Sequence, residues 1–336
     1  MMGLETRVFT AADAGAVLKL TREQSYPEFR WYRLTKQDFA VDYLAWQVER
    51  FLGEEACFGR VVVKEGEIVG FVGAARSPWE SEHFGLPMAT IAHIFARGEG
   101  NERAAIAAAL LASLEGDARD RGFRHLRGMS DIEDTALLLA LQERKFLLVD
   151  TLVTYISDNQ RPPAAPPPVD PSFTFETYRK EDFGRIDPGE ISHIAKFMRE
   201  AYRIDRFHAD PRLPREKCHE VYVEWFRNVF NGNWADGVHL LRKEGRVVGF
   251  LGFQYFAEIE ARYGSKIIGR GLSAVLPEGR GGYSALTHAT VNLCPYGSRH
   301  AEFDSQIQNF PVINVWVRNG LSFARGRYTL HRWLDR

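Results

Sequence analysis

Apolar residues along the chain follow two spacings, which predict strands in some segments and helices in others. In the first half, alternating and β-branched runs predict strands at Thr6–Phe9, Phe58–Val63, Ile68–Ala75, Met88–Phe95, near His125–Arg127 and at Phe146–Ile156. Helical spacing in that half predicts helices at Ala11–Arg22, Lys36–Phe51, Glu102–Arg121 and from Asp134 to Arg144. The second half repeats this order, with strands that include His239–Arg242, Val247–Tyr255, Ile267–Val275, Ala301–Ser305 and Arg325–Trp333. Each half is therefore expected to form a mixed α/β sheet with helices on both faces.

The two halves share sequence as well as pattern. The segment Lys64–Gly73 (KEGEIVGFVG) matches Lys243–Gly252 (KEGRVVGFLG) at nearly every position, and a Glu-Gly turn between two apolar runs is typical of a hairpin. Weaker matches follow in the same order, pairing Arg124-His125 with Arg299-His300, Asp134 with Asn309, Phe146 with Leu321 and Thr154 with Thr329. Two sets of matches in one order favour a duplication over coincidence.

A proline-rich segment, Arg161–Pro171 (RPPAAPPPVDP), separates the two halves. Proline lacks the amide donor and fixes φ, so this segment is expected to be an extended connector. We predict one domain at residues 1–160, a linker at 161–172 and a second domain at 173–336. The total of 336 residues agrees with two domains, at roughly 100–200 residues for each.

Composition narrows the classes of function. The chain has 43 basic and 44 acidic residues, so no overall field is present to hold duplex nucleic acid, although a local pocket for one nucleotide stays open. Cys57, Cys218 and Cys294 are far apart and form neither a disulfide framework nor a zinc pattern. The N-terminal residues lack the features of a signal peptide, and the apolar stretch Ala104–Leu114 is too short to span a bilayer. We expect a soluble cytoplasmic protein without nucleic-acid, membrane or metal partners, whose oligomeric state is open and compatible with a monomer.

The most informative segment runs from Leu272 to His288 (LSAVLPEGRGGYSALTH). An apolar strand ends at Pro277, a glycine-rich turn carries Arg280, and a helix is predicted to begin near Tyr283. The backbone amides of such a turn and the positive end of the helix dipole favour the binding of a pyrophosphate, and Arg280 adds a charged hydrogen-bond donor. A plain strand-to-helix turn stays open as an alternative. The segment lacks the G-x-G-x-x-G pattern, which excludes a Rossmann assignment.

This segment resembles the acyl-CoA-binding motif of the GCN5-related N-acetyltransferase (GNAT) superfamily, in which a strand is followed by Pro-x-x-Arg-Gly, a turn of small residues and a helix. Downstream, Asn309–Leu321 (NFPVINVWVRNGL) is similar to the second pattern of that superfamily, Asn-x-x-Ala-x-x-x-Tyr-x-x-x-Gly-Phe. The resemblance covers most of the second half and, more weakly, the first half. It implies an α/β fold of two tandem GNAT-like domains, each a mixed, mostly antiparallel sheet flanked by helices. It also implies acetyl-CoA or another acyl-CoA as co-substrate, without a metal.

The resemblance further implies which residues contact acyl-CoA. They belong to the strand end, the turn, the start of the helix and the second pattern: Leu272, Ala274, Val275, Gly279, Arg280, Gly281, Gly282, Tyr283, Ser284, Asn309 and Trp316. A backbone amide near Leu272–Ala274 is expected to stabilise the oxyanion that develops during acyl transfer.

A narrower resemblance rests on four further stretches. They are Trp79–Gly85 (WESEHFG), Leu148–Tyr155 (LVDTLVTY), Arg206–Pro214 (RFHADPRLP) with Tyr222 and Trp225, and Arg327–His331 (RYTLH). Together they resemble the tandem-domain acyltransferases of nucleotide-linked amino sugars, the family that includes TDP-fucosamine acetyltransferase. This resemblance implies transfer of an acetyl or similar acyl group from coenzyme A to the amine of a nucleotide-linked amino sugar.

Three side chains are candidates for proton transfer. His331 follows the predicted final strand and has a pKa suited to a general base, with a histidine packed at a sheet end as the alternative. Asp304 ends the strand before Asn309 and is a candidate to orient the amine or a water, with a turn or cap residue as the alternative. Trp316 stands where the superfamily usually has an acidic tyrosine, and an indole does not give up its proton. Tyr283 is therefore a candidate acid, as are water and Tyr328, and departure of the thiolate without protonation stays open.

The loop residues Arg206, His208 and Asp210 are candidates for binding the sugar nucleotide, with a structural cap or salt bridge as the alternative. The first half departs further from the superfamily pattern. Its loop Ala96–Arg103 (ARGEGNER) lacks the proline and carries two carboxylates, which repel a pyrophosphate. We therefore expect only the second half to bind acyl-CoA.

Two other functions stay open from the sequence. One is an aminoacyl transferase of the peptidoglycan-bridge type, which also pairs two such domains. Such proteins usually insert a long helical hairpin, and the sequence shows no long heptad segment that would predict one. The other is a non-catalytic acyl-CoA or nucleotide-sugar binding protein, which Trp316 keeps open.

Overall fold

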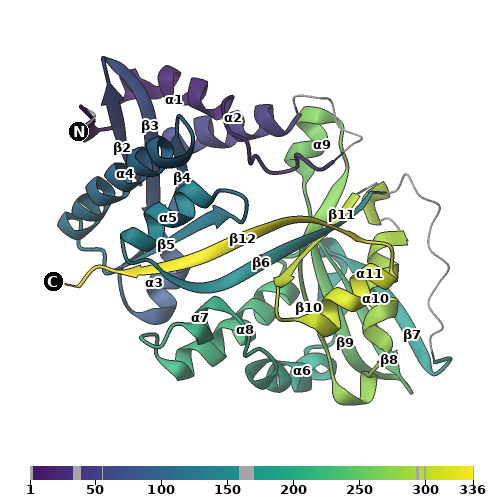
Figure 1. Ribbon diagram of the computed structural model, residues 1–336. Coiled ribbons are helices and arrows are strands. Elements are labelled where there is room, and N and C mark those ends of the chain that lie inside the picture. The colour runs from purple at the N-terminus through teal and green to yellow at the C-terminus, as the bar shows by residue number, and fades with distance from the viewer. Residues whose placement is uncertain are drawn as a thin grey trace. The chain divides into compact units, whose positions relative to one another are not determined.

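The computed structural model describes residues 3–32, 39–54, 56–158, 170–292, 295–298 and 300–335 (Figure 1). Most of the predicted linker 161–172, the start of the predicted helix Lys36–Phe51, Cys294 and Arg299 lie outside the described residues. The chain divides into unit 1, which comprises Met1–Thr151 and Gly326–Arg336, and unit 2, which comprises Leu152–Arg325. The predicted α/β class is confirmed, with helices flanking mixed sheets.

Unit 1 contains the strand order β1-β2-β3-β4-β5-β12, in which only the β4–β5 pair is parallel. Its elements are β1 (Glu5–Val8), η1 (Ala11–Asp13), α1 (Ala14–Thr21), α2 (Phe39–Leu52), β2 (Cys57–Lys64), β3 (Glu67–Arg76), α3 (Pro78–Phe84), β4 (Met88–Ala96), α4 (Gly100–Asp120), β5 (His125–Asp131), α5 (Thr135–Glu143), the start of β6 (Leu147–Asp158) and most of β12 (Ser322–Trp333). Neighbouring β3 residues point to opposite faces. Phe71 packs in a core with Val17 and Phe51 of α1 and α2, whereas Val72 packs in a core with Leu110 of α4.

Unit 2 repeats this arrangement with the strand order β6-β11-β10-β9-β8-β7, in which only the β10–β11 pair is parallel. Its further elements are β7 (Phe173–Arg179), η2 (Lys180–Arg185), α6 (Pro188–Ala201), α7 (Arg206–Ala209), α8 (Arg215–Phe230), β8 (Gly237–Lys243), β9 (Arg246–Tyr255), α9 (Ala257–Tyr263), β10 (Ile267–Val275), η3 (Pro277–Gly279), α10 (Gly282–Asn292), η4 (Pro295–Gly297), β11 (His300–Gln306) and α11 (Phe310–Arg318). On β9, Phe250 packs against Phe226 of α8, whereas Leu251 packs in a core with Leu286 of α10. Helices α8 and α10 therefore cover opposite faces of this sheet.

The repeated Glu-Gly turns form the predicted hairpins. Glu65 and Gly66 have φ values of 53° and 82°, and Glu244 and Gly245 have 50° and 79°. Two consecutive residues with positive φ suit a tight hairpin turn, because its twist matches that of the flanking strands. The shared sequence thus gives the same local geometry in both units.

The last strand of each sequence half lies in the compact unit of the other half. Strand β12 pairs antiparallel with β5 of unit 1, with Leu330 opposite Gly128 (Figure 1). Strand β6 pairs antiparallel with β11 of unit 2, with Tyr155 opposite Phe303. The compact units therefore differ from the sequence halves at these two strands. The predicted boundaries of 1–160 and 173–336 describe the duplication and stay a prediction.

A buried carboxylate holds β12 in unit 1. Glu115 of α4 is 0% exposed and is approached by Arg144 at 3.0 Å, by Arg119 at 3.3 Å and by Arg332 of β12 at 3.4 Å. Burying one carboxylate among three guanidinium groups compensates its desolvation. Because Arg332 belongs to the exchanged strand, this network joins the C-terminus of the chain to α4.

Candidate active site

Strands β10 and β11 are paired over only part of their length. Their parallel ladder consists of Ile267 opposite His300 and Ile268 opposite Ala301, although β10 continues to Val275 and β11 to Gln306. The register of β10 with β9 shifts between Gly269 and Leu272, which is a β-bulge, and bulges bend the strand that carries them. The second part of β10 thus has a ladder partner on the β9 side alone.

The backbone of β10 offers hydrogen-bonding groups on the side away from β9. The Leu276 N–H donates to β9 at 2.8 Å, and ladder bonds alternate along an antiparallel strand. Leu272 and Ala274 therefore direct their N–H and C=O groups toward β9, whereas Ser273 and Val275 direct theirs away from it. Of the strand residues predicted to contact acyl-CoA, Val275 is placed to do so through its backbone. Ser273 has the same orientation; it lies within the predicted stretch Leu272–Ala274 but was not itself named as an acyl-CoA contact.

The glycines of the turn after β10 are required by space and by backbone conformation. A Cβ on Gly279 would lie 2.9 Å from Val275, and one on Gly282 would lie 2.1 Å from Leu241. Gly281 has a φ of +95°, which side chains disfavour. The turn is thus closely packed on β8 and β10, with its outer side lined by backbone.

The turn leads into α10 and carries positive charge. The first amides of a helix have no partner within it, and the first turn of α10 contains no acidic residue. Arg280 is exposed, and no hydrogen bond or ion pair of its side chain is found within the described part of the chain. Lys243 donates from Nζ to the Glu278 carbonyl at 3.4 Å and adds a second cation, while the Glu278 carboxylate lies 3.8 Å from Arg246. These groups suit a pyrophosphate.

Tyr283 and Trp316, both predicted site residues, meet between α10 and α11. The indole Nε1 of Trp316 donates to the Tyr283 hydroxyl oxygen at 3.0 Å. Because the phenol oxygen accepts this bond, its own proton remains to be donated elsewhere. Burial raises the pKa of Tyr283, while hydrogen bonds with Ser273 and Trp316 act in the opposite direction. The phenol therefore keeps its proton at neutral pH and lies beside the unpaired edge of β10.

Tyr202, at the C-terminus of α6, also reaches this edge. Its hydroxyl donates to the Ser273 carbonyl, one of the groups that point away from β9. Its ring stacks on Tyr222 of α8 with centroids 3.9 Å apart. Burial raises the pKa of Tyr202 well above its ordinary value, and the neighbouring Tyr283 raises it further. Two phenols thus flank Ser273.

The remaining predicted residues near the turn have structural partners. Ser284 accepts a hydrogen bond from the Asn319 side chain at 3.0 Å. Asn309 occupies the N-cap position of α11 and donates to the Ser305 hydroxyl at 3.0 Å. Both contacts connect α10 and α11 to neighbouring elements, and the roles of Ser284 and Asn309 in binding acyl-CoA stay predictions.

Asp304 lies on β11, and Thr154 of β6 donates to its Oδ1 at 2.5 Å. The neighbouring Phe303 packs on Trp316 with ring centroids 5.6 Å apart. Because successive residues of a strand point to opposite faces, Asp304 faces away from α11, toward the side covered by α6 and α8. Its carboxylate therefore lies on the face of the sheet opposite Trp316.

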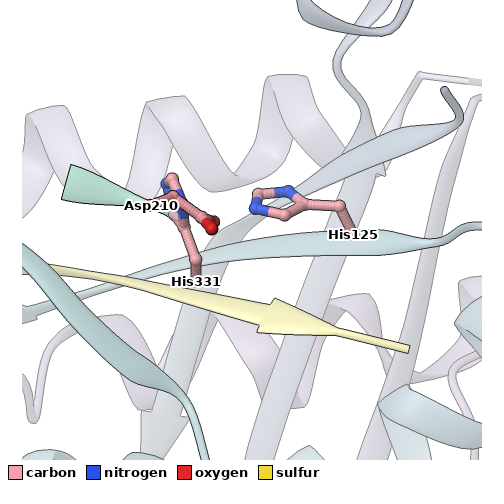
Figure 2. A group of neighbouring side chains, drawn as sticks. All are labelled: His125, Asp210 and His331. Atoms are coloured by element: carbon pink, nitrogen blue, oxygen red, sulfur yellow. The ribbon is translucent and has the colours of Figure 1, made fainter. Parts of the chain in front are cut away.

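His331 lies in unit 1, because β12 pairs there with β5. It is buried opposite Arg127, and its ring meets that of His125 edge to face with centroids 4.5 Å apart (Figure 2). The structure thus places His331 in another unit than Tyr283 and Asp304, and its catalytic role stays a prediction.

The predicted sugar-nucleotide residues lie around α7. His208 is buried and bonded to Asp205, Asp210 is buried and accepts from the Arg212 amide at 3.0 Å, and Arg206 lies over the Phe207 ring at 3.9 Å. These contacts are the structural alternative that the sequence left open, and they leave the substrate-binding role untested.

The corresponding edge in unit 1 is closed by an ion pair. Strands β4 and β5 pair only from Met88–His125 to Thr90–Arg127, as in unit 2. Here, however, Arg103 of α4 donates to the Ala96 carbonyl at 2.5 Å and forms a bidentate pair with Asp134 at 2.6 and 3.2 Å. Arg97 is engaged by Glu23 and Glu67, and the first turn of α4 contains Glu102. In unit 1, the arginine side chains near this edge are thus engaged in internal ion pairs, whereas Arg280 of the turn in unit 2 is left available.

Sequence reasoning missed Ser273, Tyr202 and Lys243. Ser273 follows from the predicted strand once its register with β9 is known. Lys243 carried a signal, because it belongs to the repeated hairpin that precedes the strand. Tyr202 lies about seventy residues before β10 and has no local signal.

These features define a tandem arrangement of GNAT-like units, and comparison with solved structures agrees. A tandem GNAT protein from the clavulanic acid biosynthesis pathway aligns over 99% of this chain and 99% of its own, with a TM-score of 0.59 and 17% identity. A GCN5-related N-acetyltransferase from Sphaerobacter thermophilus aligns over 99% of this chain and 96% of its own, with a TM-score of 0.59 and 15% identity. The chain therefore has the tandem GNAT fold that the sequence motifs predicted.

Sequence comparison gives a shorter match. The spore coat polysaccharide biosynthesis protein SpsD of Bacillus subtilis (strain 168) is 28% identical over 167 residues, which are 48% of this chain and 54% of that protein. The match thus spans about half the length of this curated relative. No family model matches the chain. Among the described residues, no helix is both long and apolar enough to cross a membrane.

Proposed function

We propose that the protein is an acyl-CoA-dependent N-acyltransferase whose acceptor is the amine of a nucleotide-linked amino sugar. The observation that carries this proposal is the edge of β10 in unit 2, where the backbone groups of Ser273 and Val275, the turn around Arg280 and the Tyr283 hydroxyl come together. The tandem GNAT fold supports acyl transfer. The match to a polysaccharide biosynthesis protein and the narrower motif resemblance support a sugar acceptor.

The residues of the turn fit the diphosphate of coenzyme A. Gly279 and Gly282 leave no room for a side chain, Arg280 has a charge without a partner in the described chain, and the start of α10 supplies amides. Backbone N–H and C=O groups of Ser273 and Val275 suit the amides of the pantetheine arm. When bound, acyl-CoA supplies the thioester whose acyl group is transferred. In unit 1 the ion pairs of Arg97 and Arg103 take these places, so the proposal assigns acyl-CoA to unit 2 alone.

In the proposed reaction the chain supplies orientation and proton transfer. A β10 backbone amide donates to the oxygen on which negative charge develops. Asp304 accepts a proton from, or orients, the attacking amine, and Thr154 fixes its carboxylate through Oδ1. Tyr283 donates its proton to the departing thiolate, while Trp316 fixes the phenol oxygen. The site thus replaces the usual acidic tyrosine of α11 by a tyrosine of α10 that Trp316 orients.

Binding of acetyl-CoA tests the location of the site. Ligand at about 100 times its Kd stabilises the native state by about 2.7 kcal/mol, which raises the Tm by a few degrees. We expect this rise in the wild-type protein and in the matched variant Arg97→Gln of unit 1, but not in Arg280→Gln. If no acyl-CoA raises the Tm of the wild-type protein, the proposal is contradicted. If acetyl-CoA does not raise the Tm of Arg97→Gln, the assignment of the site to unit 2 is contradicted.

Release of the thiol tests for turnover. Incubation with acyl-CoA and candidate amino sugars should release free coenzyme A in proportion to acylated product. Tyr283→Phe should lower kcat by at least tenfold with little change in KM for acyl-CoA, because it removes a proton donor and leaves the ring. An acyl-CoA-dependent Tm shift without thiol release would instead favour a non-catalytic binding protein.

A further inference from the structure

Four side chains around α7 and α8 form one hydrogen-bonded cluster. His208 Nδ1 lies 2.5 Å from Asp205 Oδ2, His208 Nε2 lies 3.0 Å from His219 Nδ1, and Arg203 donates to the same His219 Nδ1 at 2.7 Å. We call Arg203, Asp205, His208 and His219 the relay cluster. Asp205 and His208 are buried, whereas Arg203 is exposed and His219 is half-buried, so the cluster runs from the interior of unit 2 to its surface.

The hydrogen bonds of the relay cluster determine which ring nitrogen of His219 carries a proton. A guanidinium group can only donate, so His219 Nδ1 is an acceptor. His208 Nε2 then faces this acceptor, while His208 Nδ1 lies against the Asp205 carboxylate. Partial burial lowers the pKa of His219, and the charges of Arg203 and His208 lower it further. His219 is therefore neutral and carries its proton on Nε2.

Three carboxylates nearby, those of Asp205, Glu216 and Glu220, are already engaged by other groups. Asp205 Oδ1 accepts the backbone amides of Phe207 and His208 at 2.8 and 2.9 Å, and its Oδ2 accepts His208 Nδ1. Glu216 and Glu220 each lie 2.7 Å from Arg199. The segment from residue 199 to 219 contains six Arg and Lys residues against four Asp and Glu. Basic residues thus outnumber acidic ones in this part of unit 2.

Two donors of the relay cluster are left for a ligand. His219 Nε2–H has no partner among the described residues, and within the same part of the chain the other guanidinium nitrogens of Arg203 have none. The buried Asp205–His208 pair holds the His219 ring in place. A fixed N–H donor beside a guanidinium is an arrangement that matches phosphate oxygens.

We propose that the relay cluster is a binding site for a diphosphate group, with Arg203 and His219 Nε2 as its donors. On the proposed function, this diphosphate is that of the nucleotide to which the acceptor sugar is linked, and this assignment rests on that function. The cluster adds Arg203 and His219 to the predicted His208, and it gives His208 a positioning role, since that side chain acts through His219.

Titration calorimetry with pyrophosphate tests the site directly. Wild-type protein should bind pyrophosphate, and the Kd should rise at least tenfold in Arg203→Gln and in His219→Leu. The matched control is Arg227→Gln, which removes an exposed arginine of α8 outside the relay cluster and should leave the Kd unchanged. Both altered side chains lie at the surface end of the cluster, and the Tm of each variant checks that it is folded.

Coenzyme A also contains a diphosphate, so the same variants are titrated with acetyl-CoA. The inference expects Arg203→Gln to bind acetyl-CoA as the wild type does and Arg280→Gln to bind pyrophosphate as the wild type does. Pyrophosphate binding that Arg280→Gln abolishes and Arg203→Gln preserves would place the anion at the glycine-rich turn and overturn the inference. Absence of pyrophosphate binding in the wild type also overturns it, whereas absence of acetyl-CoA binding alone refutes only the proposed function.

Discussion

The stability of unit 2 should depend on pH through one buried histidine. His239 of β8 is 0% exposed, its Nδ1 lies 2.8 Å from the Thr177 hydroxyl, and its ring packs on Phe253. Burial lowers the pKa of His239 to about 4, against about 6.5 in an unfolded chain. The perturbation is a change from pH 7.5 to pH 5.0, applied to the wild type and to His239→Leu.

The sign and size follow from proton linkage. Between pH 6.5 and pH 4 the unfolded chain binds a proton at this position and the folded chain does not, so acid favours unfolding. The contribution of the neutral His239 side chain to the free energy of unfolding is fully present above about pH 6.5 and is lost as the pH falls toward 4. At pH 5.0 the difference between the two pKa values gives a loss of about 2 kcal/mol relative to pH 7.5, close to a factor of 30 in the unfolding equilibrium.

Urea unfolding at the two pH values measures this loss. The free energy of unfolding of the wild type should fall by about 2 kcal/mol more than that of His239→Leu, and contributions of other groups cancel in this comparison. Thr177 is exposed, so water satisfies its hydroxyl in the variant.

A second, half-buried histidine gives the control in the other unit. Burial lowers the pKa of His93 of unit 1 to about 4 as well. Peptide-resolved hydrogen exchange should show that His239→Leu changes the acid response of β8 and β9, and that His93→Leu changes that of β4. An equal loss of stability in the wild type and His239→Leu would refute the reasoning.

Three further changes probe packing and the site. Glu115→Ala should destabilise the protein by about 1–3 kcal/mol in urea unfolding, because it removes a buried carboxylate that three partly exposed arginines contact; a loss below about 0.5 kcal/mol would contradict the proposed anchoring of β12. Gly282→Ala should lower stability by about 1–3 kcal/mol and weaken acetyl-CoA binding, since its Cβ would lie 2.1 Å from Leu241; an unchanged Tm would show that the turn has room. Trp316→Phe should lower kcat while the KM for acyl-CoA changes little, because it removes the donor that fixes the phenol; a change in KM alone would assign the indole to binding.

Local chemistry made much of unit 2 predictable. The strand of β10, the glycine turn and the start of α10 follow from residues that are neighbours in sequence, and Gly281 adopts the positive φ that glycine permits. The repeat predicted the hairpins for the same reason. Helices α3 and α9 were not predicted, because each is only seven residues long, too short for a periodic pattern to emerge.

Contacts between distant segments were beyond such reasoning. The bond from Trp316 to Tyr283 joins residues 33 positions apart, and the contact of His208 with His219 joins residues 11 positions apart on different helices. Cys218 and His219 are adjacent on a helix and so point apart, which gives His219 no partner in its sequence neighbour. Nothing in the local pattern indicated that His219 would instead meet His208 and Arg203.

By itself, the sequence determined that this chain is a duplication of an α/β unit, that a glycine-rich turn follows the central strand, and that its two copies differ in charge at that turn. Only the tertiary structure decided which sheet the last strand of each half joins. The alternating apolar and polar residues of β12 and β6 would allow either strand to pair with any open sheet edge, because strand pairing uses backbone groups that every residue has. The choice is made by long-range contacts such as those of Glu115 with Arg332, and it places His331 in unit 1 and Thr154 beside Asp304 in unit 2.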